Sequence, residues 1–159
     1  IMKKTFFLSF IGLLFAYAFT PIQTNDNVDK NALTASCRKK MEPYKYDSQK
    51  FTRINFTKKS QQLEVEVPVF VGEKYRLVFN TTAMPENPAI GINVYTKSKD
   101  QGKREAIFSN KDIPAGTKEL VFDAPRLRKL FIDYDVPATD STAADQKLSG
   151  YILFMVGYK

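Results

Sequence analysis

Histidine is absent from this 159-residue sequence, and so is tryptophan. Without histidine a Ser-His-Asp or Cys-His catalytic arrangement cannot be built, and the commonest general base and metal ligand is missing. The sequence also has no glycine-rich phosphate loop, nucleophile elbow or zinc-ligand spacing. An enzyme would have to act through carboxylates or lysine alone, as glycosidases do with carboxylates. We therefore expect a protein that is not an enzyme, with a carboxylate-dependent hydrolase as one alternative.

Cysteine occurs once, at Cys37, so the chain cannot form an internal disulfide. Its stability must come from a packed core, for which the length is sufficient. Cys37 could be a core residue, a reactive thiol beside cations, or half of an intermolecular disulfide. Lipid attachment is not expected, because Cys37 lies eighteen residues beyond Phe19 and the anchor must directly follow the apolar run.

The sequence has one long apolar run, which lies near its start. Two lysines precede an apolar run over residues 6–15, and residues 16–18 have the small-residue spacing of a cleavage site. This pattern is typical of a secretory signal peptide, which we place at residues 1–18. The run is shorter than the ~20 residues that a spanning helix needs, so we expect no membrane span after cleavage. A periplasmic or secreted location follows, and nucleic acid is not an expected partner.

A short helix is predicted over residues 31–42. Leu33, Cys37 and Met41 follow one another at intervals of four residues, which places them on one stripe of a helix. Pro43 would end the helix, because the residue before a proline is biased away from helical angles. Residues 19–30 are polar and read as a leader that precedes the helix.

The rest of the chain, residues 44–159, reads as one domain of short strands. Residues 62–70 alternate apolar and polar side chains, residues 75–79 do the same, and Gly72 between them predicts a hairpin. Residues 151–156 lack a polar face and predict a central strand. The expected strands lie at residues 51–57, 62–70, 74–80, 90–96, 104–110, 118–124, 129–135 and 149–159. Turn residues separate them, so we predict an all-β fold: a single antiparallel β-sandwich, jelly-roll-like, with about eight strands.

Positive charge is concentrated in one segment. Residues 37–60 contain eight Lys or Arg and two acids, a net charge of +6, whereas residues 61–159 contain thirteen of each sign. The eight cations are Arg38, Lys39, Lys40, Lys45, Lys50, Arg53, Lys58 and Lys59. Such a segment could contact an envelope protein or an anionic surface, or it could be an ordinary solvated face.

Acidic residues cluster late in the chain, at Asp133, Asp135, Asp140 and Asp145. Asp133 and Asp135 should point to the same side of a strand, and the following loop could bring the other two nearby. Calcium prefers oxygen ligands of this kind, although the spacing does not match an EF-hand loop. Calcium is therefore the one cofactor considered, against a solvated strand face followed by a polar loop.

Two stretches carry a resemblance to known families. "VGEKYRLVFN" and the closing "SGYILFMVGYK" resemble the hairpin and terminal strand of pre-peptidase C-terminal domains, which are non-catalytic jelly-roll modules. The order "CRKKMEPYKYD", "GEKYRLVFN" and "FMVGYK" is also similar to small exported β-sandwich proteins of the Bacteroidetes. The resemblance implies an envelope location and a single sandwich, and it implies no activity.

Together these features favour a non-catalytic exported β-sandwich that acts as a binding or accessory module of the cell envelope through protein–protein contacts. The alternative is a glycan or small-ligand binding module that uses the sandwich loops, with calcium as a stabilising ion.

Overall fold

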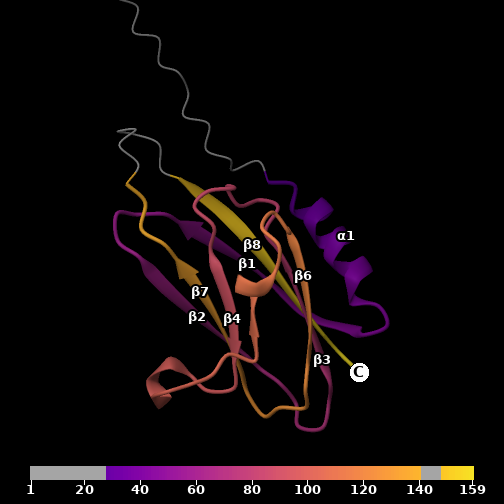
Figure 1. Ribbon diagram of the computed structural model, residues 1–159. Helices are drawn as coiled ribbons and strands as arrows, with labels where there is room; N and C mark the ends of the chain where they lie inside the picture. Colours follow the sequence, from indigo (N-terminus) through magenta and orange to yellow (C-terminus); the bar gives the residue numbers. More distant parts are fainter. Residues whose placement is uncertain (1–27, 141–147) are drawn as a thin grey trace, which may run out of the picture.

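The structure of the protein, a computed structural model, describes residues 28–140 and 148–159. The predicted signal peptide lies outside these residues. Within them the chain forms one α-helix, two short 3-10 helices and eight strands (Figure 1). The elements are α1 (Lys30–Met41), β1 (Lys45–Asn55), β2 (Gln61–Val67), β3 (Tyr75–Asn80), β4 (Gly91–Tyr95), η1 (Lys99–Gln101), β5 (Phe108–Ser109), η2 (Asn110–Asp112), β6 (Glu119–Ala124), β7 (Leu130–Val136) and β8 (Ser149–Tyr158).

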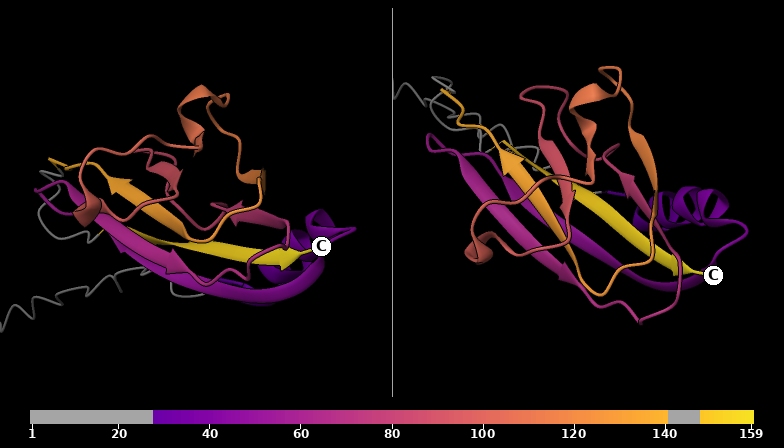
Figure 2. Two further views of the ribbon diagram at one scale, coloured as in Figure 1. Left: turned by 90° about the horizontal axis from the view of Figure 1, so that it is seen from below. Right: turned by 60° about the horizontal axis from the view of Figure 1, so that its bottom comes forward.

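The strands form two antiparallel four-stranded sheets that lie face to face (Figure 2). Sheet A has the order β1-β8-β3-β6, and sheet B has the order β2-β7-β4-β5. This is the jelly-roll arrangement, in which most consecutive strands belong to opposite sheets. The predicted all-β sandwich with an N-terminal helix is confirmed, and the apolar last strand, β8, is central in sheet A as expected.

The predicted hairpin between residues 62–70 and 75–79 is wrong. Strand β2 pairs with β7 in sheet B, whereas β3 pairs with β6 and β8 in sheet A. Pro68 ends β2 because proline has no N–H to donate to a neighbouring strand. The turn residues that follow then carry the chain from one sheet across to the other.

The core between the sheets is built from the inward face of each strand. Its centre is a group of phenylalanines, where the Phe79 ring lies 5.2 Å from Phe154 and 6.2 Å from Phe108 between centroids. Phe108 in turn lies 5.0 Å from Phe122. Because β5 has only two residues, these ring contacts across the sandwich add to the few hydrogen bonds of its strand pairing.

Helix α1 covers the outer face of sheet A. Its buried stripe of Leu33, Cys37 and Met41 packs on Val78, Leu153 and Met155, as the spacing predicted. The Asp29 carboxylate accepts hydrogen bonds from the first backbone amides of the helix. The other end of the helix packs closely against β8. A Cβ atom at position 157 would lie only 2.5 Å from the Met41 sulfur, so the strand has glycine there.

The loops gather at the two ends of the sandwich, and this decides which segments can act together. The β2–β3, β4–β5 and β6–β7 loops lie at one end, with the last residue of β8 beside them (Figures 1 and 2). The β1–β2, β3–β4 and β5–β6 loops lie at the opposite end. Residues distant in sequence are therefore neighbours at each end.

Candidate binding surfaces

The basic segment begins on the last turn of α1. Arg38, Lys39 and Lys40 are exposed there, where cations are favourable beside the helix C-terminus. The Arg38 guanidinium lies over the ring of Tyr46, 4.6 Å from its centroid, and Tyr46 is itself 41% exposed. Lys40 Nζ lies 3.9 Å from a carboxylate oxygen of Glu119.

The other five predicted cations follow β1, the edge strand of sheet A, and its turn into β2. Lys45, Lys50 and Arg53 lie on the strand, and all three are exposed. Lys58 and Lys59 lie in the turn at the far end, so the eight residues are spread over roughly 40 Å at the spacing of a strand. We call these eight residues the basic edge. The structure spreads them from the last turn of α1 along β1, and Lys40 is directed to Glu119 of β6 at the opposite edge of sheet A, so they do not form one compact site.

Aromatic rings accompany the cations of the basic edge on the outer face of sheet A. The Arg53 guanidinium lies 5.8 Å from the centre of the Tyr151 ring. Lys30 Nζ, which the sequence analysis did not include, lies 5.5 Å from the ring centres of both Phe51 and Tyr151. This face therefore combines cations with aromatic rings, a composition common in the energetically dominant parts of protein interfaces.

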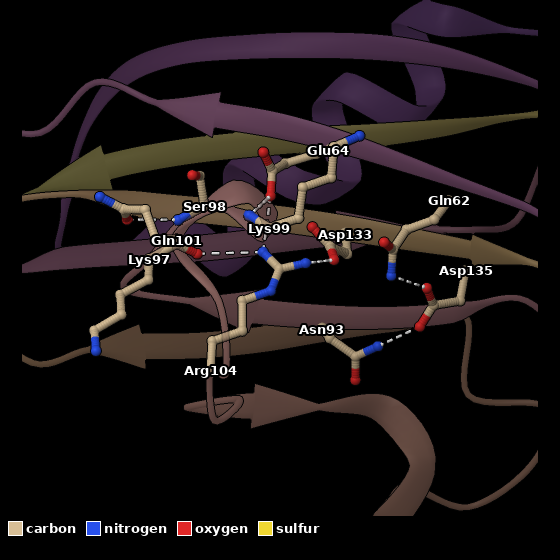
Figure 3. Close-up of polar contacts among 10 residues, drawn as sticks. All are labelled: Gln62, Glu64, Asn93, Lys97, Ser98, Lys99, Gln101, Arg104, Asp133 and Asp135. Carbon is tan, nitrogen blue, oxygen red and sulfur yellow. Dashed lines mark hydrogen bonds and ion pairs between the residues drawn. The ribbon is translucent and has the colours of Figure 1, made fainter.

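Sheet B carries a second polar cluster, which the sequence analysis missed (Figure 3). Arg104, in the β4–β5 loop, reaches back over the outer face of the sheet and forms ion pairs with Glu64 of β2 and Asp133 of β7. Its guanidinium also lies 4.0 Å from the centre of the Tyr95 ring and donates to the Lys97 carbonyl. The Lys99 backbone N–H donates to the Glu64 carboxylate at 2.7 Å. Arg104 thus fastens the loop to two neighbouring strands.

Burial decides the electrostatics of this cluster. Asp133 is 0% exposed, so the expected solvated strand face is wrong at this residue. Burial raises the pKa of its carboxyl above the usual range, and the Arg104 cation opposes that rise. Asp135, on the same side of the strand, accepts hydrogen bonds from Gln62 at 2.8 Å and Asn93 at 2.7 Å. Both aspartates are held by protein donors.

The four predicted calcium ligands are not brought together in the part of the chain that the structure describes. Asp133 and Asp135 share a face of β7 as predicted, but their oxygens face Arg104, Gln62 and Asn93. Asp140 is exposed beyond the end of β7, and Asp145 lies outside the described residues. Residues 28–140 and 148–159 contain no group of three or more potential acidic, cysteine or histidine metal ligands. Calcium binding stays a prediction.

Cys37 is a core residue. Its side chain is 0% exposed on the helix stripe that faces sheet A. Burial, with the nearby Glu119 carboxylate, raises the pKa of the thiol to about 11. The reactive thiolate is therefore disfavoured at neutral pH, and the cations that follow Cys37 in sequence lie on the exposed side of the helix.

A cleft of about 710 Å³ opens at the end of the sandwich opposite the β2–β3 loop. Its walls are the β3–β4 and β5–β6 loops, with Pro85, Pro88 and Pro114 among the lining residues. Asn110 ties the walls together, because its side chain accepts from the Ile92 N–H and donates to the Ile90 carbonyl. The volume falls within the range of small-molecule sites, and no aromatic residue lines the cleft.

No protein-family model and no curated protein matches the chain. Among solved structures, it is similar to the crystal structure of Aeromonas hydrophila PliG, a periplasmic lysozyme inhibitor of g-type lysozyme. The match has 13% sequence identity and a TM-score of 0.44, and it covers 72% of this chain and 88% of that chain.

Proposed function

We propose that the protein is a non-catalytic binding or accessory module of the cell envelope that acts through protein–protein contacts at the basic edge. The observation that carries this proposal is the exposed Arg38–Tyr46 pair, with Arg53, Lys30 and Tyr151 on the same side of sheet A. Arginine and tyrosine are enriched among the residues that dominate binding energy in protein interfaces. The surrounding lysines would attract an acidic partner and raise its rate of encounter.

The state of the buried carboxylates supports a non-catalytic role. Glu64 and Asp133 are directly opposite each other on β2 and β7, so they are the neighbouring acids to consider for a carboxylate-dependent hydrolase. Both are ion-paired with Arg104. A general acid or base must reach its substrate, whereas Asp133 is 0% exposed and its carboxylate is covered by Arg104. The cluster therefore fits a structural role, in which Arg104 holds the β4–β5 loop against sheet B, better than a catalytic role.

The predicted signal peptide supports a periplasmic or secreted location for this module. In the described part of the chain, no helix is both long and apolar enough to cross a membrane.

Neutralising the helix end of the basic edge tests the proposal. The variant R38Q/K39Q/K40Q should weaken capture of the partner from native envelope fractions by about tenfold, because the Arg38–Tyr46 contact and part of the attraction are lost. Quantitative mass spectrometry of cross-linked complexes, repeated at rising salt, measures the effect. The matched control K97Q/K99Q/K103Q removes the same charge from the exposed β4–β5 loop and should retain capture. Equal capture by both variants would refute the assignment of this surface.

The cleft favours a second candidate function, the binding of a glycan or another small ligand. Ala115 lines the cleft and is exposed, so A115W should fill part of it without disturbing the core. If this function is correct, a glycan panel should contain a ligand that raises the melting temperature of the natural protein by a few degrees. This is roughly the shift expected when the ligand concentration is 100 times its Kd. A115W should abolish the shift. The same assay with calcium tests the predicted metal, and no shift with any compound would count against both.

A further inference from the structure

The most exposed apolar side chains of the described residues stand together at the tip of the β2–β3 loop. Phe70 is 71% exposed and its neighbour Val71 is 76% exposed. We call these two residues the apolar tip. Large apolar side chains this exposed and adjacent to one another are unusual unless they meet a partner.

The fold holds the apolar tip away from the core. The Phe70 backbone N–H donates to the hydroxyl of the buried Tyr75 at 2.7 Å, which fixes the start of the turn. After the turn, Lys74 and Lys159 exchange two backbone hydrogen bonds of 3.1 and 2.9 Å, so the loop is tied to the end of β8. Gly72 supplies the positive φ of 100° that turns the chain after Val71. These contacts fix the backbone of the turn that presents both side chains to solvent.

Cations surround the tip on neighbouring segments. The β6–β7 loop lies beside the β2–β3 loop at this end of the sandwich, and Lys159, the residue after β8, is hydrogen-bonded to Lys74 there (Figures 1 and 2). These segments contribute five exposed cations: Lys74, Arg126, Arg128, Lys129 and Lys159. The same segments contain one acid, Glu73. Glu66 and Asp123 lie on the adjoining strand ends, and Asp123 is ion-paired with Arg76.

We infer that the apolar tip inserts into an anionic lipid surface, with the surrounding Lys and Arg in contact with the headgroups. Two side chains on a convex turn present far less area than the about 800 Å² that a stable protein interface buries on each partner. The same two side chains suit the boundary between headgroups and acyl chains, where each gains burial without a shaped pocket. Nearby cations strengthen such attachment to anionic lipid. The tip is separate from the basic edge, so this inference does not depend on the proposed protein contact.

Vesicle sedimentation tests the inference with the protein purified as the cell exports it. The natural protein should bind vesicles of phosphatidylcholine and phosphatidylglycerol in equal amounts about tenfold more tightly than vesicles of phosphatidylcholine alone. The variant F70S/V71S should lose about tenfold on the mixed vesicles. R126Q/R128Q/K129Q should lose the preference for the anionic lipid. V121S, which changes an exposed valine on the outer face of sheet A, should bind like the natural protein.

Fluorescence gives a second readout, because the chain has no tryptophan of its own. The emission of F70W should shift to the blue on mixed vesicles, and bromine on the acyl chains should quench it, while V121W should show neither change. Binding of F70S/V71S equal to that of the natural protein would overturn the inference. It would also be overturned if the natural protein did not bind mixed vesicles and F70S/V71S lost capture of an envelope protein, since the tip would then be a protein contact.

Discussion

Replacing Arg104 by methionine (R104M) should lower the free energy of unfolding by about 3–5 kcal/mol, the usual cost of removing one partner from a buried ion pair. Arg104 is the counter-ion of both Glu64 and Asp133, and only 11% of its side chain is exposed. Methionine preserves much of the apolar stem but leaves two carboxylates without a cation. Unfolding in denaturant, followed by circular dichroism, measures the loss.

The pH dependence of R104M shows whether the charge of Asp133 is the cause. Burial already raises the pKa of this carboxyl, and removal of Arg104 removes the cation that opposes the rise. A carboxyl whose pKa is higher in the folded state than in the unfolded state destabilises the fold when ionised, and this effect declines as the pH falls. The difference in stability between R104M and the natural protein should therefore narrow from about pH 7 to about pH 4.

Two further variants control this prediction. K103M removes the neighbouring exposed cation and should change the free energy of unfolding by no more than about 0.5 kcal/mol. Adding D133N to R104M should restore part of the lost stability, because the uncompensated charge is gone. Equal losses in K103M and R104M would mean that the cluster does not fasten the loop.

Replacing Phe79 by alanine (F79A) should cost about 3–5 kcal/mol, as expected for removal of a large side chain from a packed core. Phe79 is 0% exposed and lies between the rings of Phe108 and Phe154, one from each sheet. Its removal would leave a cavity at the centre of the sandwich and deprive Phe108 of β5 of one of its two ring contacts. The midpoint of unfolding in denaturant should fall with little change in the slope.

The same substitution at Phe70 provides a matched control, because only the surroundings of the side chain differ. Phe70 is 71% exposed, so F70A should change the free energy of unfolding by less than about 0.5 kcal/mol. F70A should instead weaken attachment to mixed vesicles, which F79A should do only by unfolding the protein. A loss of stability in F70A as large as that in F79A would show that the apolar tip is part of the core.

The strands were predictable because their side chains alternate locally. Leu63 and Val65 against Glu64 and Glu66 indicate β2 without any knowledge of its partners, and the helix stripe around Cys37 is equally local. The pairing of the strands, in contrast, could not be predicted from the local sequence. A turn with Pro68 and Gly72 suits a hairpin as well as a passage to the opposite sheet, and only the competition among all eight strands decides between them.

The Arg104 cluster was not predictable for the same reason. Its assembly depends on the register that sets Glu64 opposite Asp133, two residues that are far apart in the sequence. It also depends on the path of the β4–β5 loop, and the polar composition of this loop does not indicate that it crosses the outer face of sheet B. Alternating strands mark Asp133 as outward-facing, and an outward position normally means solvent. Here the loop covers that position, so the periodicity was correct and the expected exposure was not.

The position of β8 has a consequence for the order of events during biosynthesis. This strand joins β1 to β3 in sheet A, and its partners on β1 lie about a hundred residues earlier in the chain. The ribosome releases β8 after the other seven strands, so β1 stays without a hydrogen-bonding partner until then. For a chain predicted to carry a signal peptide, sheet A can close only after β8 has been synthesised, which would delay folding during export.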